Sequence, residues 1–177
     1  MSRCWPVLLA VAFFAADVST QQKPLTSPAT SPHTAASARF DIRGVWKVTE
    51  LAWSTPGGDW EIHKVYLSQY IFTKRHYTYM YVPGAGPRKR FVGDPNRPTD
   101  AEKVEAYNSF IAASGTYTLS GQTLALQRLI TKNPNEMDGN TLIYTVEFVD
   151  SNTLRMVVSN PPFLPGREQR TVLTRIE

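Results

Sequence analysis

Cysteine is nearly absent from this sequence, which holds a single one, Cys4, among 177 residues. Small exported domains usually gain stability from disulfide bonds, and this chain cannot form one within itself. Burial of apolar side chains must therefore hold the fold together, and 42% of the residues are hydrophobic. The length suits one globular domain with extensions, since two large domains would not fit.

Histidine is scarce too, and the motifs of common enzymes are missing. The domain contains only His63 and His76, whose spacing matches no zinc or copper motif, so no metal site and no cofactor are expected. The sequence also lacks a G-x-S-x-G nucleophile turn and a glycine-rich phosphate loop. An enzyme is therefore the less favoured hypothesis. It would be a cavity enzyme of isomerase or cyclase type, with Glu50, a histidine or a tyrosine as acid or base.

The sequence has no apolar run of membrane-spanning length. The run 5–16 follows Arg3 and is too short for a bilayer core of about 30 Å. This pattern predicts a signal peptide over 1–20 and an exported protein, periplasmic or secreted, with no stable membrane insertion after cleavage; an uncleaved anchor is the alternative. Residues 21–38 are rich in Pro, Ser and Thr and predict a disordered tether, which leaves 39–177 as the folded domain.

Period-two hydrophobic patterning, broken by turn signals, covers most of that domain. The turns are short, such as Ser120-Gly121 and Asp150-Ser151-Asn152, so sequential strands should be antiparallel neighbours. We therefore expect an all-β domain, an eight-stranded antiparallel up-and-down barrel with one inserted α-helix. The expected strands are 45–53, 60–72, 76–82, 115–119, 123–130, 141–149, 153–158 and 169–176.

One segment has helical rather than strand periodicity. Thr99 and Glu102 form a capping box, and apolar residues then recur at helical spacing, which predicts a helix over 100–113. Its apolar face should rest on the barrel, either as a lid over the mouth or as a structural support of the wall.

The first expected strand opens with Gly44-Val45-Trp46, which resembles the Gly-x-Trp opening of the lipocalins and their calycin relatives. Further segments resemble the bacterial lipocalin-like domain family. These segments are 70–77, 98–103, 106–112, 114–117 and 173–175. The resemblance covers about 43–175 and implies the barrel fold without indicating a ligand.

Two residues are expected to close the barrel. An indole fills the narrow end of a small barrel well, so Trp46 is the expected plug, with an ordinary core tryptophan as the alternative. The first and last strands must pair to close an up-and-down barrel. Arg175 should then lie across the face of the Trp46 indole in a cation–π contact.

Two charged residues are expected inside the barrel. If Trp46 points inward, strict alternation sends Glu50 inward as well, and Arg128 shares a face with Leu126 and Ile130. Buried charges need partners, so either Glu50 and Arg128 pair or Arg128 holds the carboxylate of a fatty-acid-like ligand. A β-bulge in either strand would reverse the face and turn the charge to solvent.

Tyrosines supply the remaining candidate ligand-binding residues. Tyr77, Tyr79 and Tyr81 share one face of their strand. If that face lines the cavity, together with Tyr144, the pocket is amphipathic; if the opposite face with Met80 lines it, the pocket is apolar. The tyrosine stripe could also be an exposed or half-buried strand face.

Basic charge is concentrated in one part of the sequence. Six of the seven charged residues between 74 and 97 are basic, and the chain as a whole carries +4. The Pro- and Gly-rich loop 83–98 could steer an anionic ligand, dock on an anionic partner, or be solvated without a role.

The leading hypothesis is an exported lipocalin-like barrel that binds a small hydrophobic or amphipathic molecule. The alternatives are the cavity enzyme and an interaction module that uses loop 83–98. No nucleic-acid partner is expected, because the basic and aromatic run near 74–81 lacks an RNA-binding motif. The sequence leaves the oligomeric state open.

Overall fold

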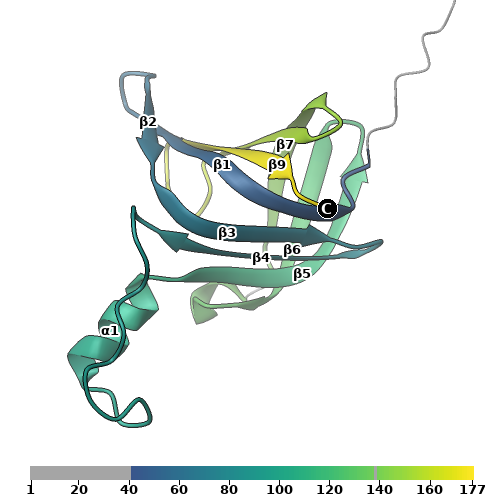
Figure 1. Cartoon of the computed structure of the whole chain (residues 1–177). Helices are drawn as coiled ribbons and strands as arrows, with labels where there is room; N and C mark the ends of the chain where they lie inside the picture. The colour runs from purple at the N-terminus through teal and green to yellow at the C-terminus, as the bar shows by residue number, and fades with distance from the viewer. Residues whose placement is uncertain (1–40, 138) are drawn as a thin grey trace, which may run out of the picture. The chain divides into compact units, whose positions relative to one another are not determined.

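The computed structural model describes residues 41–137 and 139–177, which form an antiparallel β-barrel with one α-helix (Figure 1). The expected signal peptide (1–20) and tether (21–38) lie outside the described residues. The strands are β1 (Gly44–Ser54), β2 (Trp60–His63), β3 (Val65–Phe72), β4 (His76–Pro83), β5 (Ile111–Ser120), β6 (Thr123–Thr131), β7 (Thr141–Asp150), β8 (Thr153–Ser159) and β9 (Glu168–Arg175).

The strands follow one another around the barrel in sequence order from β3 to β9, and β1 pairs with both β3 and β9. Eight strands thus close the barrel, which confirms the predicted fold class. The prediction of one strand over 60–72 was wrong, because the chain breaks at Lys64. The first piece, β2, pairs with the end of β1. The pairing of the second piece, β3, with β1 is limited to the beginning of β1.

A β-bulge in β1 changes which residues face the interior. The pairing with β9 shifts between Val48 and Glu50, so the alternation reverses there. Trp46 is fully buried, and beyond the bulge Leu51 is buried while Glu50 pairs with an outer-face residue of β9. The prediction that Glu50 points into the barrel was therefore wrong.

The two ends of the barrel differ. At the end where β1 begins, Trp46 donates a hydrogen bond from Nε1 to the Ile42 carbonyl at 2.8 Å, and both residues are buried. The Arg175 guanidinium carbon lies 4.1 Å from the Trp46 ring centroid. Arg175 also donates to the carbonyls of Asp41, Arg43 and Ser151, so it ties the entering chain and the β7–β8 turn to this closed end.

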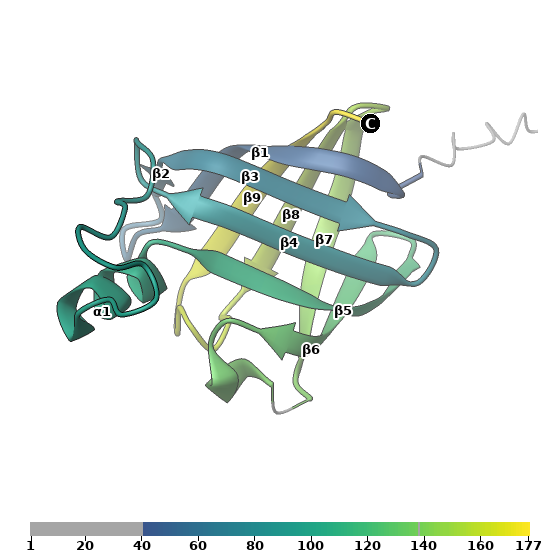
Figure 2. The same cartoon turned by 60° about the horizontal axis from the view of Figure 1, so that its bottom comes forward.

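The helix α1 (Asp100–Asn108) lies between β4 and β5 and ends earlier than predicted. The capping box of Thr99 and Glu102 is present, as expected. Residues 111–113 belong to β5 instead of the helix, since they pair with β4. In the described chain α1 buries none of its residues and projects away from the barrel, so it is neither a lid nor a support of the wall (Figures 1 and 2). No described helix is long and apolar enough to cross a membrane.

Candidate functional site

A cavity of about 240 Å³ opens inside the barrel at the end opposite Trp46. It lies where β1 and β4 end and where β5 and β9 begin. Aromatic side chains form most of its wall, and Arg128, Glu136 and Gln169 are the polar residues. The aromatic residues are Trp53, Tyr70, Tyr79, Tyr81, Tyr144 and Phe163.

The tyrosines of β4 face the interior. Tyr77 and Tyr79 are buried and Tyr81 packs against the same core. Neighbouring rings along the strand stack at 6.2 and 6.4 Å, and Tyr79 stacks on Tyr70 of β3 at 4.9 Å. Tyr79 and Tyr81 line the cavity, whereas Tyr77 lies deeper in the core. Of the two faces considered for this strand, the tyrosine face therefore lines the cavity, and the pocket is amphipathic.

Burial keeps these hydroxyls protonated. It raises the pKa of Tyr79, and the nearby Arg128 opposes that rise while Glu136 adds to it. Burial likewise raises the pKa of Tyr144, Tyr70 and Tyr81. The cavity wall thus offers neutral phenol groups at any physiological pH, and Arg128 and Glu136 are the charged residues among the described lining.

Small residues of β5 make room for the rings and for Arg128. Ala113 pairs with Tyr79, and Gly115 pairs with Tyr77 on one side and with Arg128 on the other. A β carbon on Gly115 would collide with the Gln127 backbone carbonyl, because β6 has a bulge beside it. Gly115 therefore places no side chain between Arg128 and the tyrosines.

Arg128 is 5% exposed and donates a hydrogen bond from Nη1 to Glu136 Oε2 at 2.6 Å. Its Nε and Nη2 atoms are buried and have no hydrogen-bond partner among the described residues. The Phe163 ring lies with its centroid 5.7 Å from the guanidinium carbon. A buried guanidinium with two unpaired donors is costly unless a further acceptor reaches it.

The alternative in which Glu50 pairs with Arg128 was wrong. Glu50 accepts a hydrogen bond from Arg170 Nε at 2.7 Å on the outside of the barrel, and Arg170 packs over the Trp60 ring. The prediction that Arg128 and Ile130 share one face of their strand was wrong as well. The β6 bulge turns Ile130 outward, where it is 67% exposed.

A second compartment of about 290 Å³ adjoins the first. The two share Trp53, Tyr81 and Ile111, and the second adds His63 and Lys64 from the β2–β3 break. The Trp53 and His63 rings lie 3.9 Å apart. Trp53 Nε1 and His63 Nε2 are both buried and make no hydrogen bond to the described residues.

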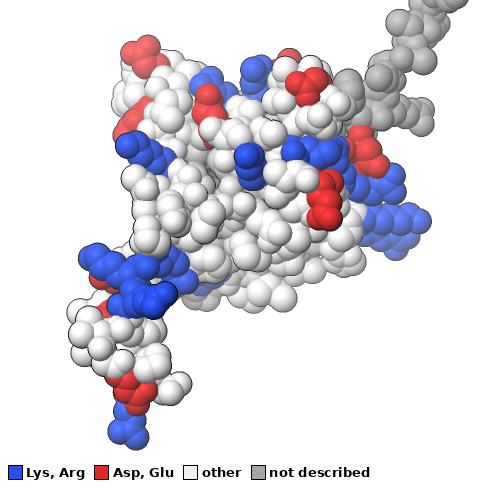
Figure 3. Space-filling view, in the orientation of Figure 1, with Lys and Arg blue, Asp and Glu red and all other residues white. Residues whose placement is uncertain are grey.

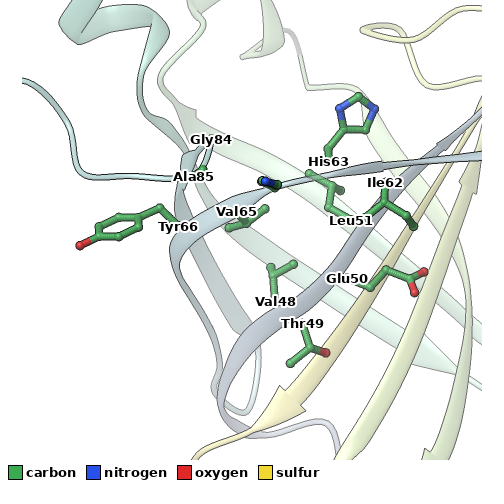
Figure 4. Close-up of a pocket in the computed structure, with 11 residues that line it drawn as sticks. Val48, Thr49, Glu50, Leu51, Ile62, His63, Val65, Tyr66, Gly84 and Ala85 are labelled. Atoms are coloured by element: carbon green, nitrogen blue, oxygen red, sulfur yellow. The ribbon is translucent and has the colours of Figure 1, made fainter.

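A groove of about 390 Å³ follows the seam where β1 and β3 separate (Figure 4). Along this seam the Val48 amide donates to the Ser68 hydroxyl instead of to a strand partner. The Glu50 carboxylate at this groove is already engaged by Arg170. In Figure 4 the His63 ring projects to the side of β2 opposite Ile62, and His63 lines both this groove and the second compartment.

The basic residues that lie close together in the sequence do not form one region of the surface. Lys74 and Arg75 lie in the β3–β4 turn at the closed end, a strand length away from the loop between β4 and α1. Figure 3 shows basic side chains both where this loop leaves the barrel and on the opposite side of the molecule. Within the loop, Lys89 pairs with Glu105 at 2.7 Å and Arg88 donates to the Ala106 carbonyl, so part of the charge serves to hold α1.

Four of the predicted ligand-binding residues thus meet in the cavity, namely Arg128, Tyr79, Tyr81 and Tyr144. Trp53 and Glu136 were missed. Strict alternation from Trp46 would have turned Trp53 outward, and no sequence signal places the 3₁₀ turn Pro134–Glu136 against Arg128. No group of three or more potential metal ligands occurs among residues 41–137 and 139–177.

Three comparisons with known proteins give no argument about this chain. No protein-family model and no curated protein matches the chain. One similar solved structure is an uncharacterized protein from Bacteroides eggerthii DSM 20697, with 13% sequence identity and a TM-score of 0.42 over 76% of this chain and 99% of that one. A similarity of this size carries no argument about fold or function.

Proposed function

We propose that this protein is a lipocalin-like barrel that binds a compact amphipathic molecule, with its apolar body among the aromatic rings and a carboxylate at Arg128. Cavities lined by aromatic side chains with a few convergent polar groups are the usual form of small-molecule sites. The wall of this cavity has that composition.

The pair of unpaired donors on Arg128 carries the proposal. Nε–H and one Nη2–H point from the same edge of a guanidinium, and this edge matches the two oxygens of a carboxylate. Glu136 occupies Nη1 and leaves that edge free of hydrogen bonds within the described chain. A ligand carboxylate would satisfy both donors, which neither the tyrosine hydroxyls nor Gln169 do here.

The size of the cavity limits the ligand. About 240 Å³ lies below the range of roughly 300–1,000 Å³ that is typical of drug-sized ligands. Medium-chain acids or acids with a single ring fit this volume better than long-chain fatty acids. Phe163, which is 43% exposed, covers the guanidinium and is the side chain that gives way as the carboxylate enters.

The test uses octanoate and 1-octanol as probes for the full chain, with binding measured by isothermal titration calorimetry. The two probes share an alkyl chain and differ in charge. Hydrogen bonds to a charged group contribute about 1.5–3 kcal/mol, so octanoate should bind at least about tenfold more tightly than octanol. Equal affinities for the two probes would refute the carboxylate site.

Variants locate the effect at Arg128. Arg128→Lys keeps the charge beside Glu136 but removes the two-donor edge, so it should lower octanoate affinity and leave octanol affinity unchanged. Arg155→Lys is the matched control, since Arg155 pairs with Glu147 on the outer surface. Circular dichroism of each variant checks that the barrel is folded.

A further inference from the structure

The adjoining compartment has polar atoms that the proposed carboxylate site does not use. Trp53 stands between the two compartments and lines both. Its Nε1–H is a donor, and His63 Nε2 next to it is a donor or an acceptor according to the tautomer. Both atoms are buried and unpaired among the described residues.

The surroundings of His63 do not already use these atoms. The nearest acid, Glu61, has Oε2 3.9 Å from His63 Nε2, which is beyond hydrogen-bond distance. Glu61 also lies 3.7 Å from Arg167, whose guanidinium carbon is 6.0 Å from the Trp53 ring centroid. The Trp53 and His63 rings are in contact, with their centroids 3.9 Å apart, and both residues line the second compartment.

We infer that the second compartment recognises a hydroxyl group at the far end of the same ligand. A hydroxyl accepts one hydrogen bond and donates another, so it would accept from Trp53 Nε1–H and donate to neutral His63 Nε2. The ligand class is then a compact hydroxy acid, with the carboxylate at Arg128 and the hydroxyl beyond Trp53. This inference rests on the proposed function, because it assumes that the carboxylate end is held first.

The alternative of a purely apolar far end predicts the opposite effect. A hydroxyl buried without a partner loses its hydration and lowers affinity, whereas one that meets two unpaired groups satisfies three polar atoms at once. Adding a terminal hydroxyl to an otherwise identical acid therefore separates the two cases by the sign of the change.

The experiment compares 8-hydroxyoctanoate with octanoate on the full chain by isothermal titration calorimetry. The hydroxy acid should bind about three- to tenfold more tightly, as expected for one or two added hydrogen bonds. Trp53→Phe and His63→Phe keep an aromatic ring and remove the polar nitrogen, so each should reduce this ratio to one or below. Trp60→Phe and His76→Phe are the matched controls, because Trp60 packs under Arg170 on the outer wall and His76 is exposed at the closed end.

Three results would overturn the inference. These are weaker or equal binding of the hydroxy acid, a preference for it that survives in both Trp53→Phe and His63→Phe, and a preference lost equally in the controls. Both probes carry the same carboxylate, so their affinity ratio isolates the hydroxyl, and the proposed function can stand when this inference fails. If octanoate itself does not bind, the proposed function fails and the inference falls with it.

Discussion

Arg128 donates from Nη1 to Glu136, whereas its Nε and Nη2 atoms have no partner among the described residues and lie at an aromatic cavity. Glu136 offsets the charge of Arg128, which would otherwise be hard to bury. It also places a negative charge beside the proposed site for an anion. Glu136 therefore stabilises the barrel through Arg128 and opposes the binding of an anionic ligand at the same time.

Glu136→Gln should separate these two effects. Loss of the carboxylate weakens the contact to Arg128, so the free energy of unfolding should fall by about 1–3 kcal/mol in urea denaturation. Octanoate should bind more tightly than to the wild type, because the repulsion is gone. Unchanged or weaker octanoate binding would show that Glu136 does not face the ligand.

Arg175→Ala should destabilise the barrel without affecting the cavity. The variant loses the cation–π contact to Trp46 and the hydrogen bonds to three backbone carbonyls, so the free energy of unfolding should fall by about 1–3 kcal/mol. Octanoate affinity should not change, since Arg175 lies at the opposite end. The control is Arg155→Ala, which removes an exposed ion pair and should cost less than about 1 kcal/mol. Equal stability of the two variants would refute this role for Arg175.

Gly115→Ala tests the close approach of β5 and β6. The added methyl group meets the Gln127 carbonyl, so the strands must separate or the bulge must shift. We expect a loss of about 1–3 kcal/mol in chemical denaturation, as for other overpacked sites. Gly93→Ala is the control, because nothing lies within 4 Å of its added carbon. A neutral Gly115→Ala would contradict the register at this bulge.

Alkaline pH should unfold the protein through its tyrosines. Burial raises the pKa of Tyr70, Tyr79 and Tyr144 in the folded state. The unfolded chain has an ordinary tyrosine pKa of about 10, so above that pH the unfolded state releases protons that the folded state retains. Stability should therefore be independent of these groups below about pH 10 and fall as the pH rises further. Tyrosinate absorbance and near-UV circular dichroism, followed together, should show these tyrosines ionising only as the fold is lost; ionisation with an intact near-UV spectrum would contradict the burial.

Much of the barrel could be predicted from the sequence because its signals are local. Alternation and short turns such as Ser120-Gly121 specify antiparallel neighbours, and the turn at Asp150–Asn152 joins β7 to β8 as expected. The end of the helix could not be predicted. Ala112 and Ala113 suit a helix, but as part of β5 Ala113 supplies the small side chain that the Tyr79 ring needs.

The candidate site was predictable only in part, because two bulges decide which side chains face inward. Alternation correctly put the tyrosines of β4 on one face, since that strand keeps its register with β5 throughout, but it left open whether this face points inward. In β1 the bulge before Glu50 turns Glu50 outward and places Trp53 at the cavity instead. A bulge depends on the paired strand as well as on its own sequence, and nothing local marks the contact of Glu136 with Arg128.

The most direct test of a carboxylate bound at Arg128 is the ionisation of the ligand itself. The ¹³C NMR signal of octanoate labelled at its carboxyl carbon, bound to the full chain, should titrate at a lower pH than that of free octanoate, because the adjacent guanidinium favours the ionised form. In Arg128→Lys the difference should shrink. A bound carboxyl group that titrates at the same or a higher pH than free octanoate, or the absence of any bound signal, would contradict the proposed site.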